Sequence, residues 1–155
     1  MSTTSADKQD NTAQIAYWND RAAVTWTTFQ ERLDASLEPL TALALDAAVP
    51  KLGERAIDIG CGCGATVLAL AQRLGPTGEV LGLDVSEPMA ARARERIAGA
   101  SLTNAQVAVS DAATHDFQGA RADLLFSRFG VMFFADPVAA FAHLRGAMRQ
   151  GGRLL

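Results

Sequence analysis

The sequence has few cysteines, and this shortage excludes a disulfide-stabilised secreted domain. Only Cys61 and Cys63 occur among the 155 residues, a usage that fits a reducing compartment. They are two positions apart, which is too close for an unstrained disulfide. No second pair of ligands is present to complete a zinc site, so we expect no metal here. The two side chains are interpreted as small residues that fill a tight turn.

The sequence also has no long apolar run and little net charge. No stretch approaches the roughly 20 apolar residues that a membrane-spanning helix needs. Residues 1–11 are polar and carry charges of both signs, unlike a secretory signal. The net charge of −3 is too small to attract nucleic acid or acidic lipid. We therefore predict a cytoplasmic protein with no membrane span and no nucleic-acid partner.

The order of helical and extended patterns divides the chain into three parts. Residues 1–12 contain few large apolar side chains and are predicted to form a disordered tail. Residues 13–50 repeat apolar residues at spacings of three and four, which predicts an N-terminal helical cap. In residues 51–155, short apolar segments alternate with helical ones. This alternation predicts an α/β domain with a Rossmann-like open, mainly parallel sheet and helices on both faces.

The pattern also predicts the individual elements of this domain. Strands are expected at residues 56–59, 80–83, 106–109, 123–126 and 153–155, and helices at residues 65–74, 88–97 and 137–148. The last strand would stop after three residues, whereas strands commonly have five or six. We therefore expect the domain to be incomplete, with its C-terminal strands missing. Its open sheet edge would then lead either to a homo-oligomer or to a marginally stable fragment.

Three glycines at alternate positions follow the first predicted strand. Gly60, Gly62 and Gly64 lie in "IGCGCG", directly before a helical pattern. In an open parallel sheet, ligands bind beside the carboxyl ends of the strands, and glycine lets the backbone approach them closely. The helix that follows offers free N–H groups and a positive dipole end. The sequence therefore predicts a cofactor site at this junction.

The glycines alone do not identify the cofactor. Gly60, Gly62 and Ala65 satisfy the dinucleotide pattern formally, and Asp84 lies about 20 residues after them, where a carboxylate binds ribose hydroxyls. This arrangement fits NAD, and it fits any other ligand that contains adenosine. An NAD-binding oxidoreductase domain is therefore one of the candidate functions.

Two further acids favour a ligand that is partly cationic. Asp58 lies within the first predicted strand, where a carboxylate aimed at the crevice would repel a pyrophosphate but attract an ammonium or sulfonium group. Asp111 follows the third predicted strand and could accept a hydrogen bond from an adenine amino group. Together with Asp84, these acids surround one crevice.

Four segments of the sequence resemble the successive motifs of class I S-adenosylmethionine-dependent methyltransferases. They are "AIDIGCGCG", "VLGLDVSEPM", "VAVSDAATHDF" and "ADLLFSRFGVMFF", in family order and at family spacing. Within this family, the chain is most similar to the small-molecule branch that includes the ubiquinone and menaquinone biosynthesis methyltransferases. The resemblance implies methyl transfer from S-adenosylmethionine to a small-molecule acceptor. A cofactor-binding fragment without turnover is the alternative, because family members carry further strands that shape the acceptor site.

The resemblance also implies which residues bind the cofactor. They are Tyr17, Trp18, Asp58, Gly60, Cys61, Gly62, Gly64, Asp84, Val85, Met89, Asp111, Ala112, Ser127 and Arg128. Asp58 would organise the glycine loop and the methionine ammonium, while the three glycines would let the loop pass under the methionine. Asp84 would hold the ribose hydroxyls, and Val85 and Met89 would line the adenine pocket.

The remaining positions would close the site. Asp111 and the backbone of Ala112 would read the adenine edge. Ser127 and Arg128 would lie near the methionine carboxylate or the acceptor. Residues 17–18 match a "YWN" element of the helical N-terminus that closes over the cofactor in similar proteins.

No general base can be assigned from the sequence. His115 follows the third predicted strand and is interpreted either as a base or as exposed polar surface, whereas His143 is expected either at the surface or packed on its helix. Phe126 is expected in the core and Phe129 in the wall of the cleft. The arginines within residues 92–96 are interpreted as a solvated helix face.

Overall fold

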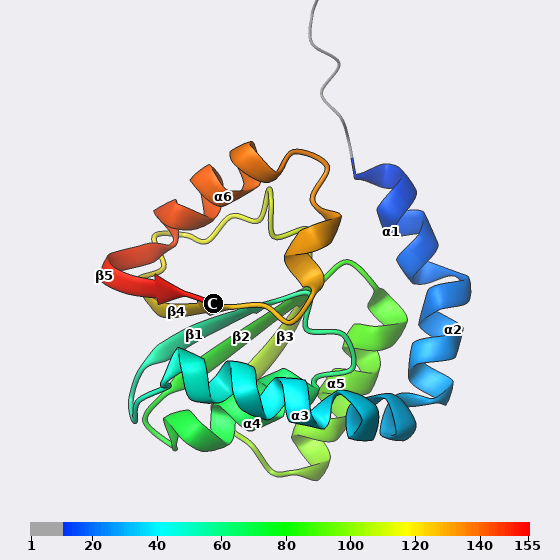
Figure 1. The fold of residues 1–155 in the computed structure, drawn as a ribbon, viewed down its shortest axis with the longest axis horizontal. Coiled ribbons are helices and arrows are strands. Elements are labelled where there is room, and N and C mark those ends of the chain that lie inside the picture. The colour runs from blue at the N-terminus through cyan, green and yellow to red at the C-terminus, as the bar shows by residue number, and fades with distance from the viewer. Residues whose placement is uncertain (1–10) are drawn as a thin grey trace, which may run out of the picture.

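The fold is that of the predicted α/β class. A computed structural model describes residues 11–155, so the predicted tail lies outside the described residues except for its last two positions. The elements are α1 (Thr12–Asn19), α2 (Arg21–Thr28), α3 (Gln30–Ala48), β1 (Arg55–Ile59), α4 (Ala65–Leu74), β2 (Glu79–Asp84), α5 (Glu87–Gly99), β3 (Ala105–Val109), β4 (Ala122–Phe126), the 3-10 turn η1 (Gly130–Phe133), α6 (Pro137–Gly146) and β5 (Met148–Leu154). Figure 1 shows their arrangement.

The strands form one parallel sheet in the order β3-β2-β1-β4-β5. Because the order reverses direction between β1 and β4, the loops after these two strands diverge and leave a crevice at their carboxyl ends. The predicted Rossmann-like open sheet is thereby confirmed. Among residues 11–155, no helix is both long and apolar enough to cross a membrane.

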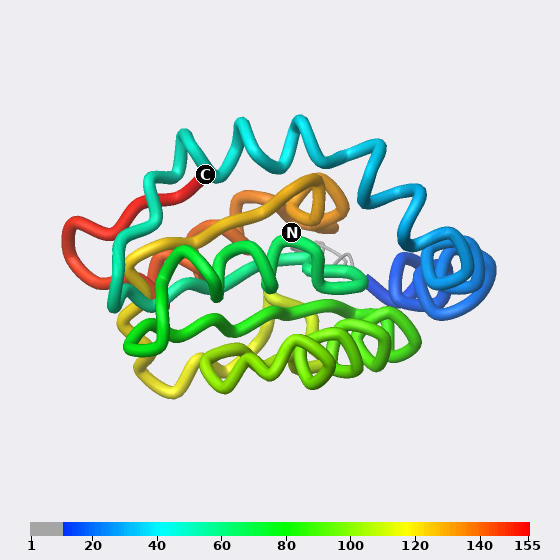
Figure 2. The backbone as a smooth tube through the Cα atoms, turned by 90° about the horizontal axis from the view of Figure 1, so that it is seen from below, coloured from blue at the N-terminus to red at the C-terminus, as the bar shows by residue number. Residues whose placement is uncertain are grey.

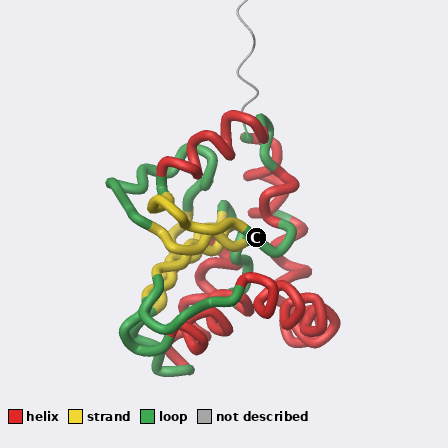
Figure 3. The backbone as a smooth tube through the Cα atoms, turned by 60° about the vertical axis from the view of Figure 1, so that its left-hand side comes forward, coloured by secondary structure: helices red, strands yellow, loops and turns green. Residues whose placement is uncertain are grey.

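Helices cover both faces of the sheet. On one face, α3, α4 and α5 pack on the sheet through a core that includes Leu70, Leu124 and Phe126. Figure 2 shows these three helices side by side, with α4 in the middle. On the other face, Leu144 of α6 packs against Ile57 and neighbouring apolar residues. The sheet therefore lies between two layers (Figure 3), and the predicted core position of Phe126 is confirmed, since this side chain is fully buried.

The first two helices stand beside the sheet at its carboxyl end. Asn19 at the end of α1 fixes them there, because its Nδ2 donates a hydrogen bond of 2.8 Å to the carbonyl oxygen of Val85. The backbone N–H of Glu87 donates in return to Asn19 Oδ1, at 3.0 Å. The third residue of the "YWN" element thus anchors α1 at the start of α5.

The last part of the chain differs from the prediction. α6 ends at Gly146, two residues before its predicted end, and β5 has seven residues instead of three. Ala122 of β4 pairs with Met148, whereas Leu124 pairs with Arg153, so β5 contains an irregularity between these two pairs. The glycines at 151–152 lie within this irregularity. They therefore lie inside the strand and do not interrupt it.

Candidate functional site

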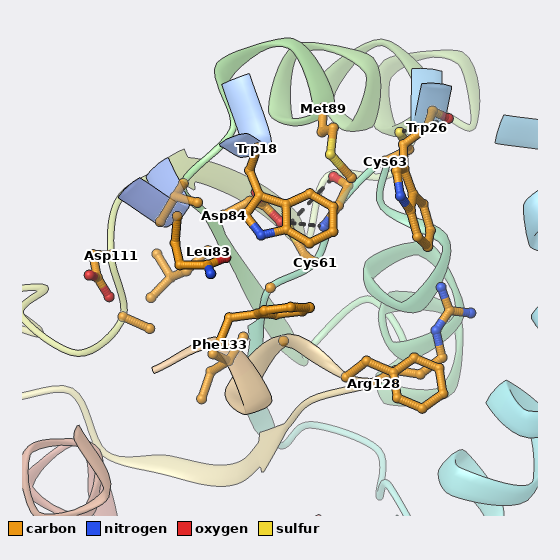
Figure 4. A pocket seen from close by; sticks show the side chains of 18 of the residues that line it. Trp18, Trp26, Cys61, Cys63, Leu83, Asp84, Met89, Asp111, Arg128 and Phe133 are labelled. Carbon is orange, nitrogen blue, oxygen red and sulfur yellow. Dashed lines mark hydrogen bonds between the residues drawn. The ribbon is translucent and has the colours of Figure 1, made fainter. Parts of the chain in front are cut away.

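A cleft with a cavity volume of about 180 Å³, open to solvent, lies at the carboxyl ends of the strands. Loops after β1, β2, β3 and β4 form its floor, and residues of α1, α2 and α3 form its roof. In the close view of Figure 4, the ring of Trp18 lies in front of the Asp84 carboxylate, and Phe133 lies lower in the view. The cleft is therefore located where the glycine junction predicts a ligand site.

Most of the residues predicted to bind a cofactor meet in this cleft. Those that line it are Trp18, Gly60, Cys61, Gly62, Asp84, Val85, Met89, Asp111, Ala112 and Arg128. Tyr17, Asp58, Gly64 and Ser127 lie outside its lining. Phe129, which was predicted to form part of the wall, does so. The topology thus brings together positions that are more than 100 residues apart in the sequence.

Asp84 anchors the glycine loop from the end of β2. Its Oδ2 accepts a hydrogen bond of 2.7 Å from the backbone N–H of Gly62, drawn as a dashed line in Figure 4. Its Oδ1 accepts one of 2.9 Å from the N–H of Ser86. Burial raises the pKa of the Asp84 carboxyl, and the backbone hydrogen bonds from Ser86 and Gly62 oppose that effect. The side chain reaches the cleft with further acceptor capacity, because each carboxylate oxygen can accept two hydrogen bonds.

Two glycines make the floor of the cleft possible where the chain crosses itself. A Cβ on Gly60 would lie 2.5 Å from the Cα of Gly130, and a Cβ on Gly130 would lie 2.4 Å from the carbonyl oxygen of Ile59. The β1–α4 loop and η1 can therefore approach only as two glycine backbones. The glycine pattern after the first strand predicts the role of Gly60, whereas Gly130 was not predicted, because a single glycine in "SRFGVMFF" carries no recognisable pattern.

Gly64 serves a different purpose from the first two glycines of the loop. A Cβ at this position would lie 2.8 Å from the Cβ of Ala93 in α5. The third glycine therefore allows α4 and α5 to pack closely, and it does not line the cleft.

Asp58 does not line the cleft, although it was expected to aim into the crevice. Its side chain is fully buried, and the Thr66 hydroxyl at the start of α4 donates a hydrogen bond to Oδ2. Successive residues of a strand face opposite sides of the sheet, so Asp58 shares the side of Ala56, where α4 packs. Among the described residues, Oδ1 has no hydrogen-bond partner.

Burial gives Asp58 an unusual titration. Desolvation raises its pKa from the ordinary value of 3.8 to about 7, while the Thr66 hydrogen bond and the charge of Arg128 oppose the rise. The protonated form is thus favoured in the folded state over much of the range below neutral pH. The carboxyl remains protonated there while the unfolded chain has already lost the proton.

This titration predicts how stability depends on pH. A carboxyl whose pKa is raised by folding contributes stability that is complete below 3.8 and is lost as the pH rises through about 7. We expect the free energy of unfolding of the wild type to fall, relative to Asp58→Asn, by on the order of 1 kcal/mol per pH unit in this interval. Urea unfolding of both proteins at pH 5, 6 and 7 measures the difference. Parallel pH profiles would contradict the raised pKa.

Asp111 lies on the cleft wall after β3, and Asn11 covers it. Asn11 Nδ2 donates a hydrogen bond of 2.9 Å to Asp111 Oδ2, and the N–H of Ala113 donates one of 2.9 Å to Oδ1. Ala112 between them is buried and also lines the cleft. The residue directly before α1 therefore touches the acid that was predicted to read an adenine edge.

Ser127 and Arg128 follow β4 but face different surroundings. Ser127 Oγ donates a hydrogen bond of 2.8 Å to the carbonyl oxygen of Ile59 and accepts one of 3.2 Å from the N–H of Val131. Ser127 therefore fixes η1 against β1. Arg128 is half-buried in the cleft wall, and its Nη1 donates 2.5 Å to the Thr41 hydroxyl of α3. Burial lowers the pKa of its guanidinium, while Asp58 and Asp34 oppose that effect.

Aromatic side chains form the outer wall of the cleft. The ring of Trp18 meets the ring of Phe133 edge to face with 5.1 Å between centroids, and it lies 6.3 Å from that of Trp26. Phe133 and Phe134 were missed as cleft residues, because an aromatic run after a strand is equally typical of core. Tyr17 is exposed and touches only the outer edge of Trp18 among the rings described.

Polar residues of α3 were also missed. Gln30 and Asp34 line the cleft one helical turn apart. Asp34 Oδ2 lies 2.8 Å from Arg96 Nη2 and also accepts a hydrogen bond from Gln30 Nε2. The side chain of Arg96 is only 20% exposed. The interpretation of residues 92–96 as a solvated face is therefore wrong for Arg96. A polar residue on a helix gives no signal of its own that it faces a neighbouring helix instead of solvent.

The cysteines and histidines are not arranged for catalysis. Both Cys61 and Cys63 are free and buried, and burial raises the pKa of Cys63 to about 11 and raises that of Cys61 well above its usual range. His115 lies outside the cleft lining with Nδ1 3.0 Å from Ser110 Oγ. The exposed His143 lies on α6 with Nε2 2.8 Å from the His115 carbonyl oxygen. In residues 11–155, no cluster of three or more His, Cys, Asp or Glu side chains could hold a metal ion.

Comparison with known proteins agrees with this geometry. Residues 56–152 match a family described as a methyltransferase domain. The chain is 34% identical over 116 residues to an aklanonic acid methyltransferase of Streptomyces sp. (strain C5), a match that covers 75% of this chain and 53% of that protein. It is 32% identical over 103 residues to a demethylmenaquinone methyltransferase of Staphylococcus aureus, covering 66% of this chain and 42% of that protein.

Solved structures agree as well. A SAM-dependent methyltransferase from Aquifex aeolicus superposes with a TM-score of 0.67 at 22% identity, covering 92% of this chain and 69% of that chain, and this likeness shows the fold. The chain spans about half the length, or less, of the curated relatives named above. The match of the family to nearly all of the sheet, from β1 into β5, decides the assignment. The chain therefore belongs to the methyltransferase-domain family.

Proposed function

We propose that the chain binds S-adenosylmethionine in this cleft and transfers its methyl group to a small-molecule acceptor. The observation that carries the proposal is the glycine loop held by Asp84 at the carboxyl end of a methyltransferase-domain sheet. The residues fit such a cofactor, because Asp84 retains acceptor capacity for ribose hydroxyls and Gly60 and Gly62 adopt positive φ beneath the cleft.

The state of the loop N–H groups supports this cofactor over NAD. Those of Gly60 and Cys61 donate to the carbonyl oxygen of Leu83 at 2.8 and 3.1 Å. The N–H of Gly62 donates a hydrogen bond to Asp84, and the N–H of Gly64 donates one of 3.0 Å to the Cys61 carbonyl oxygen. A pyrophosphate needs such groups free at the helix N-terminus. The Asp84 carboxylate beside the loop would also repel a pyrophosphate.

The remaining contacts suggest how the cofactor would be held. Val85 and Met89 would contact the adenine, and Asp111 with the backbone of Ala112 would bind its polar edge. Asn11 occupies one oxygen of Asp111 and would move aside. Arg128, whose Nε has no partner among the described residues, would attract the methionine carboxylate. We propose that the helical cap of residues 13–50 closes this site and that residues 51–155 form the cofactor domain.

The chain needs to contribute mainly alignment and exclusion of water. When bound, S-adenosylmethionine supplies a methyl group activated by the positive charge on sulfur. Trp18, Trp26, Phe129 and Phe133 would shield the reacting atoms and position an acceptor at about 3–3.5 Å from the methyl carbon. Asp58 would not contact the cofactor directly. It would support the glycine loop through its hydrogen bond from Thr66 at the start of α4.

We propose a small-molecule acceptor because similar proteins are named for small-molecule substrates. One similar protein is named for aklanonic acid and another for demethylmenaquinone. The aromatic wall of the cleft suits an apolar ring of that kind. Because the chain spans only part of these relatives, binding without turnover remains the second candidate.

Two measurements test the proposed function. Calorimetric titration should give micromolar or tighter binding of S-adenosylhomocysteine and S-adenosylmethionine and none of NAD. Incubation with methyl-labelled S-adenosylmethionine and a panel of phenols and quinols should then transfer label to at least one acceptor. Binding without transfer would favour the second candidate, whereas binding of NAD alone would overturn both.

We also propose where the protein acts and how it associates. The two free buried thiols support a reducing compartment such as the cytoplasm. The small net charge supports the absence of a nucleic-acid partner. Among residues 11–155, β5 pairs with β4 along one side, and we propose that its other side pairs with a second copy. A monomer in sedimentation at micromolar concentration would exclude this pairing.

A further inference from the structure

A chain of polar contacts joins the glycine loop to two helices through Arg96. We infer that Arg96 is a positioning residue, which holds the glycine loop in the shape that receives the cofactor. The part of this inference that concerns the cofactor rests on the proposed function. The part that concerns the loop does not.

Arg96 contacts the loop and the roof of the cleft with the same guanidinium group. It lies in the last turn of α5, and its Nη1 donates a hydrogen bond of 2.6 Å to the carbonyl oxygen of Cys63. Its Nη2 lies 2.8 Å from Asp34 Oδ2 in α3. The side chains of Arg96 and Asp34 are only 20% and 24% exposed, so solvent screens this pair less than the other ion pairs of α5.

The network continues along the inner face of α3. Gln30 Nε2 donates a hydrogen bond of 2.5 Å to Asp34 Oδ2, the oxygen that also contacts Arg96. Arg92 donates to Gln30 Oε1 from Nε and Nη2, at 3.3 and 3.1 Å. Gln30 is buried, and both Gln30 and Asp34 line the cleft. The loop, α3 and α5 therefore share one set of hydrogen bonds next to the cofactor cleft.

Two opposite charges thus hold two adjacent residues of the loop. Asp84 accepts the N–H of Gly62, and Arg96 donates to the C=O of Cys63. These bonds involve charged groups, which makes them stronger than bonds between neutral groups. The glycines on both sides of Cys63 allow many other backbone conformations. Without Arg96, the loop would keep the Asp84 contact and its backbone bonds to Leu83, but the Cys63 carbonyl oxygen would lose its charged partner, and this end of the loop would sample more of these conformations.

A purely structural bridge between α3 and α5 is the competing explanation. It predicts that loss of Arg96 lowers the stability of the whole domain and changes ligand affinity only through unfolding. A positioning role instead predicts local changes at the loop in a protein that remains folded. The two explanations differ in the behaviour of Cys63, which reports on the loop without any ligand.

The first experiment compares Arg96→Gln with Arg94→Gln. Arg94 lies in the same helix and forms an exposed pair with Glu87 at 3.0 Å, so its variant controls for loss of one arginine. We expect Arg96→Gln to raise the Kd for S-adenosylhomocysteine by about tenfold, the effect of losing one hydrogen bond to a charged group. Arg94→Gln should leave the Kd unchanged. Arg96→Lys, which can reach one partner but not both, should fall between them.

The second experiment needs no ligand. Cys63 is buried beside Trp26, whose carbonyl oxygen lies 3.7 Å from Sγ. Release of the loop should expose this thiol, so alkylation by iodoacetamide at pH 9, assigned to Cys63 by peptide fragmentation, should become several-fold faster in Arg96→Gln. Asp34→Asn should act in the same direction, and adding it to Arg96→Gln should cause no further change if Asp34 acts through Arg96.

The outcomes separate the two proposals. If the wild type does not bind S-adenosylhomocysteine, the proposed function fails, but faster Cys63 alkylation in Arg96→Gln would still support the loop role. If Arg96→Gln binds and reacts as the wild type does, the inference is overturned. It is also overturned if both cysteines become reactive only in proportion to a lower free energy of unfolding.

Discussion

Replacement of Asp84 by alanine should abolish detectable binding of S-adenosylhomocysteine, with an increase in Kd of at least about 100-fold. The carboxylate is expected to accept two ribose hydroxyls, and each hydrogen bond to a charged group contributes about 1.5–3 kcal/mol. The same side chain also fixes the loop through the N–H of Gly62. Calorimetric titration of wild type and variant measures the change.

Two variants serve as controls for this result. Asp84→Asn keeps the size and one acceptor oxygen, so it should weaken binding less than alanine does. Asp116→Ala removes an exposed acid that bonds only the nearby N–H of Gln118 among the described contacts, and it should leave the affinity unchanged. Wild-type affinity in Asp84→Ala would mean that the cofactor lies elsewhere.

Replacement of Gly130 by alanine should destabilise the domain by about 3 kcal/mol. The new Cβ would lie 2.4 Å from the carbonyl oxygen of Ile59 and 2.7 Å from the Cα of Gly60. Both are backbone atoms, so the overlap can be relieved only by moving β1, the glycine loop or η1. We therefore expect loss of ligand binding together with loss of stability, measured by urea unfolding and calorimetry.

Gly146 provides a matched control for Gly130. It ends α6, and a Cβ there would meet no atom within 4 Å. Gly146→Ala should therefore leave stability unchanged or raise it by up to about 1 kcal/mol, through the higher helix propensity of alanine. If Gly130→Ala were as stable as Gly146→Ala, the close crossing of η1 and the glycine loop would be wrong.

The sheet and its helices could be predicted because local signals agree with the final packing. The pattern of residues 65–74 lies between glycines and predicts α4 with its observed bounds. β5 could not be predicted in the same way. Its glycines at 151–152 indicate a break when they are considered locally, and only pairing with β4 turns them into a bulge.

The candidate site was predictable where topology alone decides the position of a residue. Asp84 and Asp111 follow parallel strands, so they meet at one edge of the sheet wherever the helices lie. Residues that depend on how helices pack were not predictable. Asp34 and Arg96 meet only because α3 and α5 lie beside the same loop, and a helical pattern does not encode that contact.

A structure of this protein with S-adenosylhomocysteine tests the central claim most directly. The account predicts the ribose hydroxyls on Asp84, the adenine beside Asp111 and Met89, and the sulfur above the loop that begins at Gly60. A cleft left vacant at saturating ligand, or a dinucleotide pyrophosphate seated on the loop in its place, would contradict it.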